Sequence, residues 1–205
     1  MTVIALCGWI GSGKDSVADF LVNDHGFKRM SFAGTLKDSI ASIFGWDREM
    51  LNGTTHEGRA WREKVDPWWS ARLNIPNLTP RFVLQQWGTE VCRHGFHSDI
   101  WVASVENQLR NSKDNIVISD CRFPNEIAAM RAANAMIAWV RRGDLPHWYY
   151  TAIKANTGNA DAHAEIKLMG IHESEFSWVG SDFDVEINNS GSFNDLQTSV
   201  KLLVH

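Results

Sequence analysis

Residues 8–16 constrain this chain more than any other stretch. They read Gly-Trp-Ile-Gly-Ser-Gly-Lys-Asp-Ser and follow the apolar run Val3–Cys7, which is typical of a short buried strand. They lead into residues 15–25, where apolar side chains recur on one helical face and Gly26 stands at the C-cap position. A strand, a glycine-rich loop, a lysine and a helix in this order predict a loop that binds phosphate groups.

The chemistry of such a loop depends on its backbone. Glycines let successive N–H groups turn inward toward phosphate oxygens, and the start of the helix adds further N–H groups and a positive dipole. Lys14 is expected to reach the β- and γ-phosphates of a nucleotide. The residues expected to bind the nucleotide here are Gly8, Gly11, Ser12, Gly13, Lys14, Asp15 and Ser16.

Asp15 departs from the usual pattern, in which a Ser or Thr follows the lysine and binds Mg²⁺. Three interpretations stay open. The Asp15 carboxylate is a ligand that suits a hard cation, Ser16 is the ligand if the loop winds differently, or Asp15 caps the helix. The first has a slight advantage because a carboxylate is the stronger ligand for Mg²⁺.

Composition limits the classes of function. The chain has 205 residues, 44% of them hydrophobic, which suits one domain with an inserted lobe. A net charge of −4 argues against a broad nucleic-acid-binding surface. No apolar run is long enough to span a membrane. Three cysteines without metal or redox spacing fit a reducing cytoplasm.

Strand-like and helix-like segments alternate along the chain. This alternation predicts an α/β fold, with a doubly wound parallel sheet of about five strands and the ligand at the carboxyl ends of the strands. Residues 45–80 and 144–180 lack clean periodicity, the latter with two weak helical patches, and they are expected to form a substrate lobe and a lid. The strands are expected at residues 3–7, 28–32, 115–120, 135–140 and 184–187.

Local signals mark several helices. Thr79 and Pro80 have the residue types of an N-cap and a first helical position, and that helix is expected to run through residues 82–89. The pair Asp66-Pro67 is interpreted as a break. Ser192 is expected to cap a final helix.

Asp120 ends the apolar strand at residues 115–120, as the aspartate of a Walker B strand does when it meets Mg²⁺. A phosphate monoester is largely dianionic near neutral pH, so as an acceptor it needs no general base. It needs cations instead, and arginine can bind two phosphate oxygens at once. Arg122 and Arg141 are favoured because each lies just past a strand end. The arginines expected near the cleft are Arg81, Arg93, Arg122, Arg141 and Arg142.

These motifs together resemble the deoxynucleoside monophosphate kinases of tailed bacteriophages. The resemblance spans nearly the whole chain, and the Gly-Lys-Asp variant of the loop recurs in that family. The segments that carry it are residues 8–16, Phe-Ala-Gly-Thr-Leu-Lys-Asp at 32–38, Leu-Gln-Gln-Trp-Gly-Thr-Glu-Val-Cys-Arg at 84–93, Asp-Ile-Trp-Val at 99–102, Ser-Asp-Cys-Arg-Phe-Pro-Asn-Glu at 119–126, Val-Arg-Arg-Gly at 140–143, His-Glu-Ser-Glu at 172–175 and Ile-Asn-Asn-Ser-Gly-Ser at 187–192.

The resemblance implies the fold of a phosphate-loop nucleoside monophosphate kinase. Its core would be about residues 1–44, 112–143 and 181–205, with a monophosphate-binding insertion at about 45–111 and a lid at about 144–180. It implies ATP as the donor, Mg²⁺, and a deoxynucleoside monophosphate (dNMP) as the acceptor. A single chain in the host cytoplasm, without nucleic-acid or membrane partners, fits this reading, and a homodimer is left open.

The resemblance also assigns roles to residues. Lys14, Asp120, Arg122 and Arg141 would be catalytic, and Asp15, Ser16 and Asp120 are the candidate Mg²⁺ ligands. Asn188 and Gly191 match a turn that packs against adenine in related kinases. The acceptor would be bound by Lys37, Arg81, Gln85, Trp87 and Arg93. Residues 46–78 match nothing in the family, and substrate choice is expected to depend on them.

Two other readings compete. One is a phosphate-loop kinase for another small phosphorylated acceptor, such as dephospho-coenzyme A or phosphomevalonate. The other is a nucleotide-binding ATPase without an acceptor, which would hydrolyse ATP alone.

Overall fold

The computed structural model describes residues 1–204, which form two compact units. The first unit joins Met1–Ser31 to the chain from Glu106 onward, and the second is Phe32–Val105. No helix among residues 1–204 combines the length and the apolar character needed to cross a bilayer.

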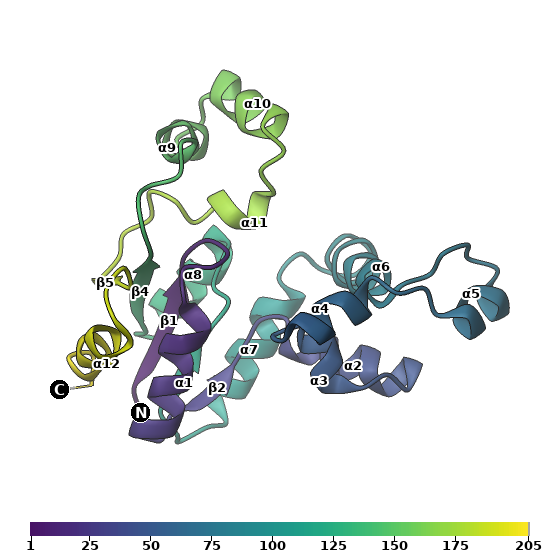
Figure 1. Ribbon diagram of the computed structural model, residues 1–205, viewed down its shortest axis with the longest axis horizontal. Helices are drawn as coiled ribbons and strands as arrows, with labels where there is room; N and C mark the ends of the chain where they lie inside the picture. Colours follow the sequence, from purple (N-terminus) through teal and green to yellow (C-terminus); the bar gives the residue numbers. More distant parts are fainter. Residues whose placement is uncertain (205) are drawn as a thin grey trace. The chain divides into compact units, whose positions relative to one another are not determined.

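A five-stranded sheet forms the centre of the first unit, in the order β2-β3-β1-β4-β5 (Figure 1). All four pairings are parallel, so the α/β class and the parallel sheet predicted from the sequence are confirmed. β1 is central, with Ile4 opposite Val117 of β3 and Met136 of β4. The strands are β1 Val3–Cys7, β2 Lys28–Met30, β3 Ile116–Ile118, β4 Met136–Arg141 and β5 Val185–Asn188.

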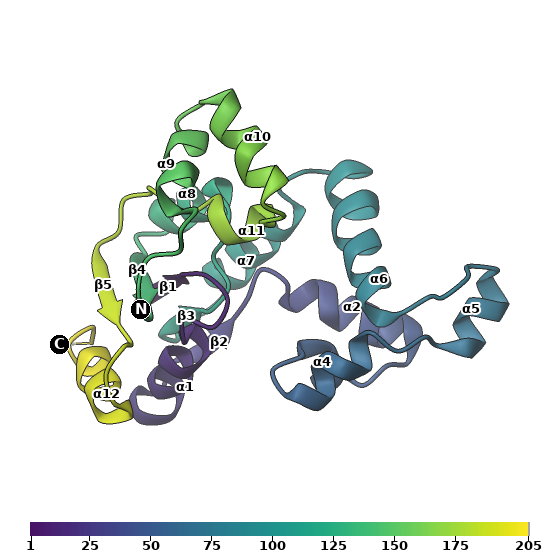
Figure 2. The same cartoon turned by 45° about the horizontal axis from the view of Figure 1, so that its top comes forward.

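Helices cover both faces of this sheet. Ile4 and Leu6 of β1 share a buried cluster with Val17 and Leu21 of α1 and with Leu196 of α12. Figures 1 and 2 show α1 and α12 side by side on this face, and α8 lies on the other face against β4. These helices are α1 Lys14–His25, α8 Pro124–Ala132 and α12 Phe193–Lys201. Gly26 ends α1 and Ser192 caps α12, as predicted.

Three helices connect β4 to β5, where the sequence predicted a polar stretch with two weak helical patches. Asn159 and His172 provide N-caps for the second and third of them, which local periodicity alone did not reveal. Trp178, which lies between α11 and β5 in the sequence, is fully buried. The helices are α9 Tyr149–Asn156, α10 Ala160–Leu168 and α11 Glu173–Phe176, and Figure 1 shows them beyond the carboxyl ends of β1 and β4.

The second unit is helical, with its own core of Leu36, Ile40, Leu51, Val83 and Trp101. It begins earlier in the chain than the expected insertion because Leu36 and Ile40 pack into this core. Its elements are α2 Gly34–Phe44, α3 Arg48–Asn52, α4 His56–Arg62, α5 Pro67–Leu73, α6 Pro80–Gln85, the π-helix η1 Gln86–His94, and the first part of α7 Ile100–Arg110.

Side-chain caps begin two helices of this unit, α6 and α5. The Thr79 cap is confirmed, since its hydroxyl accepts the Phe82 N–H at 3.1 Å. The break expected at Asp66-Pro67 lies between α4 and α5, and α5 begins there because the Asp66 carboxylate accepts the Trp69 N–H at 3.0 Å and Pro67 occupies the first turn.

The helix expected through residues 82–89 is only partly α-helical. It becomes a nine-residue π-helix from Gln86 onward, a rare form that occurs frequently at functional sites. Close packing accompanies the change, because the Trp101 indole donates to the Gly88 carbonyl at 2.9 Å. A Cβ atom at Gly88 would lie 2.8 Å from Leu36 Cδ2, so this position suits glycine.

Candidate functional site: a phosphate loop facing an arginine and a carboxylate

The loop between β1 and α1 has the backbone expected of a phosphate loop. Gly8, Gly11 and Gly13 have φ angles of 147°, 78° and 98°, which L side chains rarely adopt. Gly8 is also fixed by space, since a Cβ atom there would lie 2.5 Å from the Val140 carbonyl oxygen. The Ser12 side chain is fully buried within the loop, and its hydroxyl has no partner among residues 1–204.

Lys14 begins α1 and folds back over this loop. Its ammonium group donates to the carbonyl oxygens of Gly8 at 2.6 Å and Trp9 at 2.8 Å, and only 8% of the residue is exposed. Burial, followed by the nearby charge of Arg122, lowers the pKa of Lys14 to about 8, while Glu175 and Asp15 act in the opposite direction. The lysine is therefore a poorly solvated cation held beside the loop.

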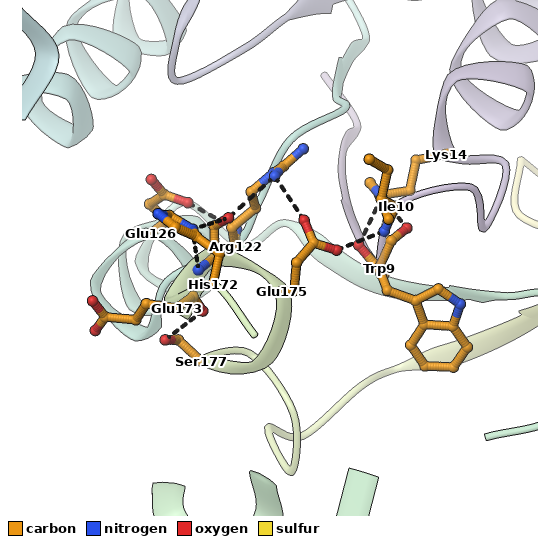
Figure 3. Close-up of polar contacts among 11 residues, drawn as sticks. Trp9, Ile10, Lys14, Arg122, Glu126, His172, Glu173, Glu175 and Ser177 are labelled. Carbon is orange, nitrogen blue, oxygen red and sulfur yellow. Dashed lines mark hydrogen bonds and ion pairs between the residues drawn. The ribbon is translucent and has the colours of Figure 1, made fainter. Parts of the chain in front are cut away.

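A carboxylate binds directly to the phosphate loop. Glu175 Oε2 accepts the backbone N–H of Ile10 at 2.7 Å, and Glu175 Oε1 lies 3.2 Å from Arg122 Nη1 (Figure 3). The Glu175 side chain, on α11, is only 19% exposed. An anion thus lies between the loop and the arginine, as the oxygens of a phosphate group would. Sequence reasoning missed this contact because 165 residues separate its partners.

Arg122 follows β3, as predicted. A buried side chain organises its backbone: Glu126 Oε2 accepts the N–H groups of Arg122 at 2.8 Å and of Phe123 at 3.2 Å. Because Glu126 binds this backbone, it helps fix the turn from which the Arg122 side chain reaches Glu175 and Ser174. Figure 3 shows the guanidinium group on the side of Glu175 opposite Ile10.

Aromatic packing holds the loop from behind. The Trp9 ring, within the loop, lies 6.0 Å from Trp139 of β4 and 5.9 Å from Trp178, centroid to centroid. Trp9, the residue after the first glycine of the loop, is only 9% exposed, so its side chain packs the loop against the core.

The turn after β5 also reaches the loop, through Asn189. Asn189 Nδ2 donates to the Ser12 carbonyl at 2.9 Å. Asn188 Oδ1 accepts the Ser190 N–H within the turn, and Gly191 allows close approach to Asp195 in the cap of α12. These contacts account for the turn itself, and the adenine role of Asn188 and Gly191 stays a prediction.

Asp15 does not cap α1, because Gly13 occupies the N-cap position. Its carboxylate forms an ion pair with Arg29 of β2, which also binds Asp19 at 3.0 Å and the Ser119 hydroxyl at 3.1 Å. No local pattern predicted this pairing. It neutralises the Asp15 carboxylate, which reduces its value as a metal ligand.

Oxygen donors for a metal ion are few. Within residues 1–204, no three His, Cys, Asp or Glu side chains gather as a ready-made metal site. Ser16 lies in the first turn of α1 and Asp120 follows β3, beside β1 in the sheet. A hydroxyl, a carboxylate and waters fit Mg²⁺, which usually takes one or two protein ligands together with phosphate oxygens.

Arg141 ends β4 and pairs with Glu186 of β5 at 2.8 Å. This ion pair lies along the β4–β5 edge, whereas Arg122 and Lys14 lie at the loop. A catalytic role for Arg141 would require exchange of this ion pair for a phosphate group.

The residues expected to bind an acceptor lie in the second unit. Lys37 on α2 lies 3.5 Å from Asn52 Oδ1, and Arg81 pairs with Glu63 at 2.9 Å. Gln85 is exposed four residues after Arg81 on α6. The other two, Trp87 and Arg93, lie on the π-helix η1.

Comparison with known proteins assigns a family. Residues 69–200 match the deoxynucleotide monophosphate kinase family. The chain is 32% identical over 138 residues to a putative deoxynucleotide monophosphate kinase of Acanthamoeba polyphaga mimivirus, covering 62% of this chain and 66% of that protein. It is 40% identical over 58 residues to the deoxynucleoside-5'-monophosphate kinase of Escherichia phage T5, covering 28% of this chain and 23% of that protein. The aligned segments thus span less than two thirds of either relative.

Solved structures give lower similarity. The chain aligns with dephospho-CoA kinase from Campylobacter jejuni at 15% identity and a TM-score of 0.46, over 99% of this chain and 95% of that one. It aligns with shikimate kinase from Aquifex aeolicus at 10% identity and a TM-score of 0.46, over 99% and 96%. The family match over residues 69–200 covers more than half of the sequence, and the chain therefore belongs to the deoxynucleotide monophosphate kinase family.

Proposed function

We propose that the chain transfers the γ-phosphoryl group of ATP to the phosphate of a dNMP, giving a deoxynucleoside diphosphate (dNDP) and ADP. The observation that carries this proposal is the Glu175 carboxylate held between the Ile10 N–H and Arg122. A loop and an arginine that bind the Glu175 carboxylate in this way can also bind the oxygens of a phosphate group. Family membership and the names of the relatives favour a dNMP as acceptor.

The chemistry needs charge and alignment rather than a base. An anionic oxygen of the acceptor phosphate attacks the γ-phosphorus, the bond to the β,γ-bridging oxygen breaks, and ADP leaves with the electron pair. No proton has to be removed from the acceptor when its phosphate is dianionic. In this proposal Lys14 and Arg122 stabilise negative charge around the transferred group.

Ser16 and Asp120 are the residues we propose to hold Mg²⁺. The ion would supply positive charge that neutralises the charge developing on the phosphates during transfer. Asp15 is the weaker candidate because Arg29 already neutralises it. Arg141 and the Asn188–Gly191 turn are proposed to border the nucleotide.

The acceptor lobe is proposed to lie in the second unit, with Lys37, Arg81, Gln85, Trp87 and Arg93 as its binding residues. The π-helix that carries Trp87 and Arg93 supports this, because such helices are concentrated at functional sites. The lid role is proposed for residues 144–180, and the host cytoplasm for the location.

An acceptor panel tests the proposal. ADP formation should be followed with the four dNMPs, the matching ribonucleotides, dephospho-coenzyme A and phosphomevalonate, and with no acceptor. We expect rapid ADP formation with at least one dNMP, slower formation with its ribonucleotide, and little without an acceptor. Lys14→Ala should abolish turnover while leaving the chain folded. Turnover confined to another acceptor, or equal turnover without any acceptor, would refute the proposal.

A further inference from the structure

Two arginines of the second unit, Arg59 and Arg62, lie against the turn after α3, around Gly53, and the charge of a third, Arg81, acts on Arg62. Arg59 Nη1 donates to the carbonyl oxygens of Thr54 at 2.8 Å and Gly53 at 3.4 Å. The Arg62 guanidinium lies against Gly53, and Arg81 of the adjacent helix α6 pairs with Glu63, the residue that follows Arg62. Figure 2 shows α4, which carries Arg59 and Arg62, within this unit.

We propose that Arg59, Arg62 and Arg81 form the site that binds the phosphate of the acceptor, with Arg62 as its central ligand. This inference rests on the proposed function. Arg81 was expected from the sequence, whereas Arg59 and Arg62 fall in the stretch at 46–78 that matched nothing in the family.

Arg62 has unused hydrogen-bonding capacity. Its Nε atom is buried and has no hydrogen-bond partner among residues 1–204. Its guanidinium group forms no ion pair within that part of the chain. Buried polar groups are normally hydrogen-bonded, so an exception of this kind points to an absent ligand. A guanidinium fork matches two oxygens of a phosphate group.

The charges around Arg62 are unbalanced. The charged groups that act on it are Arg81, Glu63 and Arg59, and Glu63 is already bound to Arg81. Burial, and then repulsion by Arg81, lower the pKa of Arg62. Three cations with one carboxylate are costly in the absence of an anion, and a phosphate dianion would offset that cost.

The backbone is shaped to seat the Arg62 side chain. Gly53 has φ 62°, and a Cβ atom there would overlap the guanidinium carbon of Arg62. Gly58 packs in turn on Gly53, since a Cβ atom at Gly58 would lie 3.3 Å from Gly53 Cα. Any side chain at Gly53 would therefore push the guanidinium group out of its place.

The test is binding of the acceptor without ATP, measured by calorimetry on the full chain with each of the four dNMPs and the matching deoxynucleosides. Arg62→Met keeps most of the side chain's length and apolar packing but removes the charge and the fork. We expect it to weaken dNMP binding by about 10- to 100-fold, the scale of a hydrogen bond to a charged group. Binding of the deoxynucleoside, which lacks the phosphate, should change less than threefold.

Further variants separate binding from folding. Arg62→Lys should restore part of the affinity, and Gly53→Ala should weaken dNMP binding because it displaces Arg62. Arg72→Met, at an exposed position of the same unit, is the control and should change nothing. The melting temperature of Arg62→Met should equal or exceed that of the wild type, because repulsion is relieved. In turnover assays KM for the dNMP should rise while kcat stays nearly constant.

The outcomes distinguish this site from the proposed function. Normal turnover with unchanged Kd and KM in Arg62→Met would overturn the phosphate site and leave the kinase function standing. A wild-type chain that binds a dNMP through Arg62 but transfers no phosphoryl group would keep the site and overturn the function. A wild-type chain that binds none of the four dNMPs would overturn both.

Discussion

Arg122 is connected to the phosphate loop by the Glu175 carboxylate, and this position predicts an effect of Arg122 on kcat. We expect Arg122→Ala to lower kcat by about 10²–10⁴-fold, or roughly 3–5 kcal/mol, because a cation that meets charge mainly in the transition state acts on kcat rather than KM. Arg122→Lys should recover only part of the rate, since it keeps the charge but loses the fork.

A structural role for Arg122 is the competing explanation, and the contacts make it weak. Glu126 binds the Arg122 backbone rather than its guanidinium group, and the ion pair with Glu175 leaves 35% of the Arg122 side chain exposed. Pairs of this kind contribute little to stability. Turnover and melting temperature should be measured on one Arg122→Ala sample. Near-normal kcat with a large fall in melting temperature would show that the role is structural.

The lowered pKa of Lys14 predicts how ATP affinity depends on pH. Below pH 8 the lysine is already protonated, so ATP binds without proton uptake. Between pH 8 and 10.5 binding must protonate it, and affinity should fall by up to about tenfold per pH unit. The folding stability of the free protein depends on pH in the opposite direction to ATP affinity. Below pH 8 the buried charge of Lys14 destabilises the folded state, and the lost stability is regained as the pH rises from 8 toward 10.5.

Calorimetry of ATP binding from pH 7 to 9.5 measures this dependence. Lys14→Arg is the matched variant, because a guanidinium group stays protonated throughout and its ATP affinity should not change with pH. A wild-type affinity that is constant across the range would contradict the assignment of Lys14 to the phosphates.

The Mg²⁺ ligand is decided by two adjacent residues. Because Arg29 neutralises Asp15, we expect Ser16→Ala to raise the Mg²⁺ concentration for half-maximal activity by about tenfold or more, and Asp15→Asn to raise it less. A Mg²⁺ titration of turnover in both variants measures the ranking. The reverse order would assign the ion to the Asp15 carboxylate.

At the scale of elements, helix α11 holds the phosphate loop in its anion-bound form. ATP must displace the Glu175 carboxylate to reach the Ile10 N–H, and this displacement also frees Arg122 to meet the charge that develops during transfer. Glu175→Gln should therefore tighten ATP binding by about 3- to 30-fold, because the glutamine neither repels the phosphates nor pairs with Arg122. Glu173→Gln, an exposed neighbour on the same helix, is the control. Weaker ATP binding by Glu175→Gln would mean that this carboxylate supports the bound state instead.

Elements also show what the sequence could and could not predict. The strand and loop ending at Lys14 were predictable because their signals are local: an apolar run, glycine spacing and a helix start. The contacts of Glu175 and Asn189 with the loop were not, since partners so distant in sequence leave no periodic pattern. The π-helix was missed for a related reason, because Trp101 and Leu36, which pack around its Gly88, lie outside the segment and leave no local pattern.

At the scale of the whole molecule, each unit has a separate part of the proposed reaction. The first carries the loop, Lys14 and Arg122, and the second carries Arg59, Arg62 and Arg81. The family match begins at residue 69, so the loop at 8–16 is supported by its own geometry rather than by that match. The alternation of strands and helices was enough to predict the parallel sheet. The part of the arginine site within residues 46–78 could be inferred only from side-chain contacts in the structure.

Transfer of the γ-phosphoryl group to a dNMP is the central claim, and following the label tests it most directly. With ATP labelled at the γ-phosphate and an accepted dNMP, label should appear in the dNDP in equal amount to the ADP formed, and Lys14→Ala should show neither product. Label released as inorganic phosphate, with the dNMP unchanged, would contradict the account.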